Sequence, residues 1–151
     1  GRAYYNGLTG PADYDEAFAW FTKSADIGDA TAQGMLGMMY YLGQGTSVDH
    51  ENAFKWTQLA ANGGDVLAMG NLGVLYRKGQ GTSVDYETAL EWYYAATALG
   101  NTNAMLELGQ MFGTGDGVAV DQQQAIMWYQ EAARAGEPRA QEFLQRNDID
   151  W

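Results

Sequence analysis

The chain offers few side chains that could carry out chemistry, and His50 is the first to consider. It is the one histidine, and it lies between two carboxylates, Asp49 and Glu51, where a general acid or base near neutral pH is conceivable. Hydrolysis would also need a nucleophile. The chain has no cysteine, and its serines lie outside any nucleophile-elbow pattern: Ser24, Ser47 and Ser83. No pair stands out among the 19 acidic residues. We therefore predict that the protein is not an enzyme.

Metal and cofactor sites are equally hard to build from this composition. Without cysteine there is no thiolate site for zinc or an iron–sulfur cluster, and a single histidine excludes paired-histidine patterns. Residues 43–48 resemble a phosphate-binding loop but lack its third glycine and its lysine, and they follow a predicted helix. Residues 113–117 have the composition of a calcium loop without its alternating ligands or its final glutamate. We predict turns at both places, with no metal and no cofactor.

The glycines of these loops belong to a repeat of 36 residues that runs through the chain without gaps. The most regular columns are Trp20, Trp56, Trp92 and Trp128; Gly28, Gly64, Gly100 and Gly136; and Leu36, Leu72, Leu108 and Leu144. A fixed period of this length is the signature of an array of similar supersecondary units.

Each unit is predicted to contain two helices, which span residues 29–42 and 50–62 in the second unit. Apolar residues recur there at the three- and four-residue spacing of a one-sided helix. Aspartates are placed to cap the second helices: Asp49, Asp85 and Asp121. Asp13 and Glu16 have the spacing of a reciprocal capping box. The glycines of the Gly28 column fall where a helix must stop, and glycine tolerates the left-handed conformation found there.

Two columns of the second helices have both a structural and a functional interpretation. The tryptophans could be stacking platforms, but an aromatic residue on the apolar stripe of every unit is typical of a core. We predict that each tryptophan packs between helices of its own unit and the next. His50 shares its column with chemically different residues, Tyr14, Tyr86 and Gln122, so we predict a solvated residue at a helix start.

The second unit carries the residues of a known repeat family. Its pattern is Ala32-x3-Leu36-Gly37-x2-Tyr40-x2-Gly43-x-Gly45-x3-Asp49-x3-Ala53-x2-Trp56-x3-Ala60-Ala61-x2-Gly64. This pattern resembles the Sel-1-like repeat, a relative of the tetratricopeptide repeat, over residues 1–151 as one array of about four units. The resemblance implies an all-α, right-handed superhelical solenoid of antiparallel helix pairs whose first helices line a concave face. Family members generally act as adaptors or scaffolds that bind proteins. One secreted bacterial branch has a cysteine pair in each repeat, which this chain lacks.

The charge of the chain narrows the class of partner. The formal net charge is −11, with 19 acidic and 8 basic residues, so there is no basic stripe to replace the counterions of a nucleic acid. No apolar run is long enough for membrane insertion, and nothing in the sequence identifies a compartment. The predicted second helices carry far more acids than bases, whereas the first helices carry equal numbers. The sequence therefore predicts an acidic convex layer and a concave face that is free for other contacts.

By analogy with the tetratricopeptide groove, certain positions of the first helices should face a partner. They combine apolar, aromatic and cationic side chains: Met38, Tyr41, Leu42, Leu67, Val74, Arg77, Lys78 and Gln110. Tyr41 and Arg77 occupy equivalent positions, and we expect Tyr41 to be buried by the partner and Arg77 to bind a carboxylate or a backbone carbonyl. An exposed apolar patch of this kind marks an interaction site.

We predict that the protein binds a peptide or protein on its concave face. The alternative is an inhibitor or immunity-type protein that occludes an enzyme, in which case an acidic surface would make association strongly salt-dependent. The two ends of the array are expected to differ. Gly1 aligns with Gly37, which suggests a truncated first helix and weak self-association through Tyr4, Tyr5 and Leu8. A polar capping helix is expected at about residues 137–147.

Overall fold

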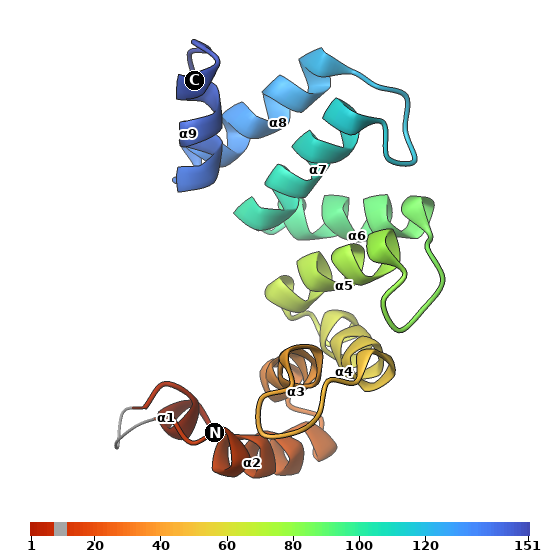
Figure 1. Cartoon of the computed structure of the whole chain (residues 1–151), viewed down its shortest axis with the longest axis vertical. Helices are drawn as coiled ribbons and strands as arrows, with labels where there is room; N and C mark the ends of the chain where they lie inside the picture. Colours follow the sequence, from red (N-terminus) through yellow and green to blue (C-terminus); the bar gives the residue numbers. More distant parts are fainter. Residues whose placement is uncertain (8–11) are drawn as a thin grey trace.

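The structure is a computed structural model that describes residues 1–7 and 12–151. Over these residues the chain forms helices and no strands: α1 (Arg2–Tyr5), α2 (Tyr14–Asp26), α3 (Ala30–Leu42), α4 (His50–Asn62), α5 (Val66–Lys78), α6 (Tyr86–Ala98), α7 (Thr102–Thr114), α8 (Gln122–Arg134) and α9 (Pro138–Arg146). Consecutive helices stack side by side into an open arc, with α1 and α2 at one end and α9 at the other (Figure 1). The predicted all-α solenoid is confirmed. Leu8 lies outside the described residues.

Side-chain caps explain why the helices begin where they do. The Asp49 carboxylate accepts a hydrogen bond from the Asn52 backbone N–H. In the same way, Asp85 accepts from the Thr88 N–H and Asp121 accepts from the Gln124 N–H. The first helices have a cap column of their own, which the sequence analysis did not single out: Asp29, Asp65 and Asn101. Both helices of a unit therefore begin directly after a polar capping residue, and the position of each cap recurs in the next unit.

The predicted capping box at α2 is only half formed. Asp13 accepts from the Glu16 backbone N–H, but the Glu16 carboxylate accepts from Trp20 Nε1 at 2.9 Å instead of returning to Asp13. The Asp13 N–H donates to the Tyr4 carbonyl oxygen, which ties α1 to the start of α2. The competing partner is the exposed indole one turn along the helix.

Trp56, Trp92 and Trp128 lie at the edge of the core, each between the first helix of its own unit and the second helix of the preceding unit, where the next unit was predicted. Trp56 packs on the cluster formed by α2 and α3, and Trp92 packs on the cluster of α4 and α5. Trp20 is 47% exposed. The residue after each tryptophan faces the first helix of its own unit, because one residue turns the helix by about 100°. Tyr93, in this position, is completely buried.

Successive units are also joined by polar contacts at one edge of the stack. The last turn of one first helix bonds to the loop of the next unit, 39 residues along the chain. The Tyr5 hydroxyl donates to Gln44 Oε1 at 3.0 Å, and the Tyr41 hydroxyl donates to Gln80 Oε1 at 3.1 Å. Arg77 makes the third such contact, to Asp116, as an ion pair. We call these three contacts the edge bonds.

Candidate concave binding site

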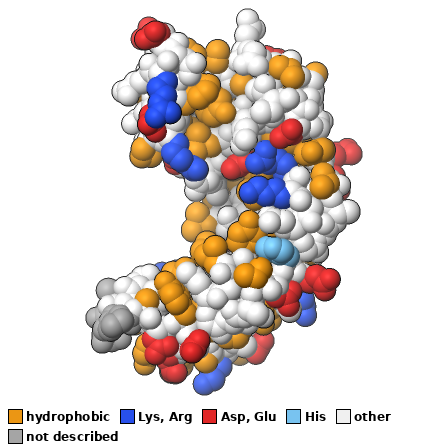
Figure 2. Space-filling view, viewed as in Figure 1, with side chains coloured by type: hydrophobic (Ala, Val, Ile, Leu, Met, Phe, Trp, Pro, Cys, Tyr) orange, Lys and Arg blue, Asp and Glu red, His pale blue; other side chains and the backbone are white. Residues whose placement is uncertain are grey.

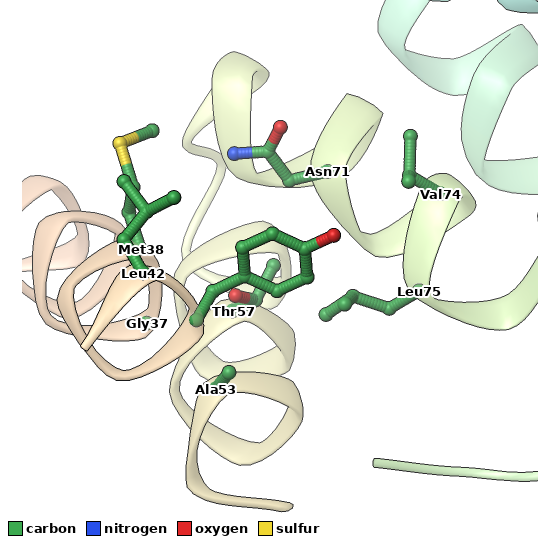
Figure 3. A pocket seen from close by; sticks show the side chains of 9 residues that line it. Gly37, Met38, Leu42, Ala53, Thr57, Asn71, Val74 and Leu75 are labelled. Atoms are coloured by element: carbon green, nitrogen blue, oxygen red, sulfur yellow. The ribbon is translucent and has the colours of Figure 1, made fainter. Parts of the chain in front are cut away.

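An apolar pocket of about 250 Å³ lies between α3 and α5, with α4 as its floor. It is lined by Gly37, Met38, Tyr41, Leu42, Ala53, Thr57, Asn71, Val74 and Leu75. Figure 3 shows Met38 and Leu42 on one wall, Val74 and Leu75 on the other, and Thr57 and Ala53 at the floor. In Figure 2, apolar side chains gather on the inner side of the bend, beside the single histidine. The spacing of the first-helix residues thus produces a hollow apolar surface.

Several of the predicted site residues meet at this surface. Met38, Tyr41, Leu42 and Val74 line the pocket together. Leu67 lines an adjoining pocket of about 360 Å³, which shares Met38 and Asn71 with the first. Leu42 is 50% exposed and Leu67 is 64% exposed, so both offer apolar area to a partner.

Arg77 does not lie free on this surface. Its guanidinium bonds to Glu107 Oε2 at 2.9 Å and to Asp116 Oδ2 at 3.2 Å, and its side chain is only 11% exposed. Nε of Arg77 is buried without a partner among the described residues. The structure therefore places this guanidinium inside the junction of α5 and α7, with its two terminal nitrogens already paired.

Tyr93 fills the same junction from the side of α6. Its hydroxyl lies against Arg77 but makes no hydrogen bond of good geometry within residues 1–7 and 12–151. Burial, and then the charge of Glu107, raise the pKa of the Tyr93 phenol above its ordinary value. Arg77 opposes this shift only in part. The phenol therefore stays neutral, and the α5–α7 junction is a closed polar seam.

Lys78 and Gln110 are exposed but do not line the pocket. Lys78 occupies the position that Leu42 holds one unit earlier, and Gln110 occupies the position of Val74 one unit later. At these two positions the apolar surface of the α3–α5 junction becomes polar in the following unit.

His50 is half-buried at the start of α4, where a solvated residue was predicted. Its Nδ1 atom is buried and has no hydrogen-bond partner among the described residues. The centre of its ring lies 5.3 Å from that of Tyr41, so it supports the wall of the pocket from behind. The sequence placed it correctly at the start of a helix. It gave no sign that the helix start is covered by a tyrosine of the same unit.

Five lining residues were absent from the predicted site: Gly37, Ala53, Thr57, Asn71 and Leu75. Thr57 and Asn71 are the two with polar side chains. Thr57 shares a column with Phe21, Tyr93 and Tyr129, and Asn71 shares one with Glu107. The signal was present, because Thr57 is the one member of its column without an aromatic ring.

The charge pattern agrees with an apolar inner surface and an acidic outer layer. Most acidic residues of α2, α4, α6 and α8 are exposed, including Asp15, Glu51, Glu87 and Glu131. Among the described residues, no group of three histidine or acidic side chains is arranged to hold a metal ion. None of the helices in residues 1–7 and 12–151 has the length and apolarity needed to span a bilayer.

The repeat period, the cap columns and the stacked helix pairs together describe one repeat type. A family model of the Sel1 repeat matches residues 1–29, 30–65, 66–101 and 102–137. The chain belongs to the Sel1 repeat family. Proteins built from Sel1 repeats generally serve protein interactions. Comparison of the sequence with curated proteins gives no match.

Solved structures show the same Sel1 architecture. A Sel1 repeat protein from Oxalobacter formigenes is 36% identical, with a TM-score of 0.88, over 96% of this chain and 59% of its own. A protective antigen of uropathogenic Escherichia coli is also 36% identical, with a TM-score of 0.85, over 93% of this chain and 30% of its own. Cysteine-rich protein B of Helicobacter pylori is 21% identical with a TM-score of 0.65, over 88% of this chain and 96% of its own, and shows the fold alone. This chain spans less than two thirds of the first two Sel1 proteins.

Proposed function

We propose that this Sel1 repeat array is a protein-interaction module that binds a peptide or protein segment on its concave face, across α3 and α5. The observation that supports this proposal is the apolar pocket at the α3–α5 junction, flanked by the exposed side chains of Leu42 and Leu67. An apolar hollow with a few polar groups at its rim is the usual form of a ligand site. The neighbouring junction is filled by the Arg77–Glu107 ion pair and the buried Tyr93 ring.

Peptides selected from a display library on the intact chain provide the test. Leu42→Glu places a charge on the wall of the pocket, and we expect it to weaken binding at least about tenfold, which corresponds to about 1.4 kcal/mol. Leu99→Glu is the matched control, because Leu99 is comparably exposed but lies at the end of α6, outside the pocket. Circular dichroism would confirm that both variants keep their helices.

Two results would contradict the proposal. One is that the selected peptides bind Leu42→Glu as well as the parent chain. The other is that binding falls steeply with salt and survives Leu42→Glu, which would move the interaction to the acidic outer layer and favour the inhibitor-type alternative.

A further inference from the structure

In every unit, one position of the second helix lies against a glycine of the first helix. These positions hold Phe21, Thr57, Tyr93 and Tyr129, and they face Gly1, Gly37, Gly73 and Gly109. A Cβ atom on Gly73 would lie 2.6 Å from the Tyr93 ring, and one on Gly1 would lie 2.7 Å from the Phe21 ring. An aromatic ring therefore lies close to a glycine in three units, and the second unit has a threonine hydroxyl there instead.

The pocket occupies the space that the missing ring would fill. In the third unit, the Tyr93 side chain passes Gly73 and reaches Arg77 and Glu107. The equivalents of these three residues are Gly37, Tyr41 and Asn71, and all three line the pocket. The hollow at the α3–α5 junction is thus the place of a side chain that the other units supply from within.

We propose that this pocket is a slot for one aromatic side chain of the bound partner. This inference rests on the proposed function and specifies it: the anchor residue of the peptide is a phenylalanine or tyrosine. The internal repeat identifies the occupant, because Phe21, Tyr93 and Tyr129 show what the same backbone arrangement accepts.

The size and walls of the slot agree with this occupant. Its volume is about 250 Å³, and an apolar protein cavity of about 150 Å³ suffices to bind benzene. No charged residue lines it. Buried aromatic side chains are also the residues that most often dominate binding energy at interfaces.

The first unit shows that a ring in this slot is compatible with the tyrosine at its wall. Tyr5 is the equivalent of Tyr41, and each donates its hydroxyl to a glutamine of the next unit. The Tyr5 ring still packs edge-to-face with Phe21, with centroids 6.4 Å apart and an interplanar angle of 71°. A partner's ring can therefore pack against Tyr41 in the same way while the Tyr41–Gln80 bond remains.

Toluene and p-cresol, the side-chain analogues of phenylalanine and tyrosine, are suitable probes for the intact chain. Methyl resonances of Met38, Leu42 and Val74 would report binding, because all three residues line the pocket. We expect saturable shifts at these methyl groups. Stronger binding of p-cresol would indicate that its hydroxyl finds a hydrogen-bond partner in the pocket, and stronger binding of toluene would indicate a purely apolar slot. Either result supports the proposal.

Three variants make the test specific. Thr57→Phe supplies the ring from within and should weaken probe binding at least about tenfold. Thr22→Phe is the matched control, since its position holds Tyr94 in the third unit and lies outside the pocket, so it should bind the probes like the parent. Tyr93→Thr should open a second slot, seen as new probe shifts at Met111 and Gln110. If Tyr93→Thr does not fold, the Thr57→Phe and Thr22→Phe pair decides alone.

The proposal is overturned if the parent shows no saturable shift, or if Thr57→Phe binds the probes as the parent does. These outcomes differ from a failure of the proposed function. Library peptides that bind the α3–α5 surface without an aromatic residue would overturn the slot and leave peptide binding in place. Peptides that carry an aromatic residue and bind the parent but not Thr57→Phe would support both.

Discussion

The junction of α3 and α5 and the junction of α5 and α7 are built from equivalent positions, yet one is open and the other is closed. Tyr41, Thr57 and Asn71 leave an apolar pocket at the first. Arg77, Tyr93 and Glu107, at the same positions one unit later, fill the second with a buried ring and an ion pair. The difference shows that the same repeat backbone accommodates either a pocket or a filled junction. Three side chains decide between the two.

The largest loss of unfolding free energy should come from removing the aromatic ring that fills the closed junction. Tyr93→Ala removes a fully buried ring, and such truncations cost about 3–5 kcal/mol of unfolding free energy. Thr57→Ala, at the equivalent position, should cost less than half as much, because its side chain is small and borders a pocket that already exists. Chemical denaturation of both variants would measure the difference. Equal losses would mean that the two junctions are packed alike.

The ion pair of the closed junction is expected to give the next largest effect. Glu107→Ala leaves the Arg77 guanidinium in a mostly buried place with only Asp116 as partner, at a cost of about 1–3 kcal/mol. Asn71→Ala changes an exposed residue at the equivalent position and should stay within about 0.5 kcal/mol.

A combined exchange in the closed junction sharpens the same comparison. Arg77→Tyr together with Glu107→Asn introduces two of the three residues of the open junction, keeps the Tyr93 ring and leaves no buried charge. We expect it to be less destabilising than Glu107→Ala, as judged by thermal melting. A larger loss in the double variant would show that the ion pair contributes more than the cost of burying its charges.

Much of the fold could be predicted from the sequence, and the reasons are local. The 36-residue period, the Asp49 cap column and the Gly28 column each report a backbone requirement that recurs in every unit. Part of the pocket could be predicted as well, since the analogy with the tetratricopeptide groove selected Met38, Leu42 and Val74.

The features that could not be predicted depend on departures from the repeat and on contacts between units. Recurring columns do not predict Thr57, because it matters as the one residue that departs from its column. The sequence also could not show that Arg77 would meet two acids 30 and 39 residues away, because those contacts depend on how successive helix pairs stack. Trp20 and its equivalents were misplaced for the same reason.

Filling the open junction should have a smaller effect, of opposite sign. Thr57→Phe places a ring against Gly37 as Phe21 does against Gly1. Cavity-filling changes commonly raise the unfolding free energy by about 0.5–2 kcal/mol. Thermal melting of Thr57→Phe beside Thr22→Phe would separate filling of the pocket from a general gain in apolar area. A lower melting temperature for Thr57→Phe alone would mean that Tyr41 already occupies the space.

The smallest expected change in stability is the one that acid causes, and it should be the same at both junctions. Hydrogen bonds from the backbone N–H groups of Asn52 and Thr88 lower the pKa of the Asp49 and Asp85 carboxyls. Because the folded-state pKa is the lower one, the caps stabilise the fold above the ordinary aspartate value. That contribution is lost as the pH falls through the lowered values, below about 4.

Hydrogen exchange of α4 and α6 between neutral pH and pH 3 would follow the loss of these caps. Asp49→Asn and Asp85→Asn keep a capping oxygen without the charge, so each should flatten the pH dependence of its own helix. If α4 opens in acid well before α6 in the parent chain, the caps are not the controlling groups.

The edge bonds also determine how the array would respond to mechanical force. Force applied along the solenoid loads them in series, since each joins one unit to the next. The Tyr5–Gln44 and Tyr41–Gln80 bonds are neutral, whereas the Arg77–Asp116 bond is an ion pair reinforced by Glu107. Under load the units on the α2 and α4 side should detach first and the last units should hold longest, which a force–extension trace would record as the order of its steps. A partner that spans α3 and α5 would then act as a clamp across the weaker half.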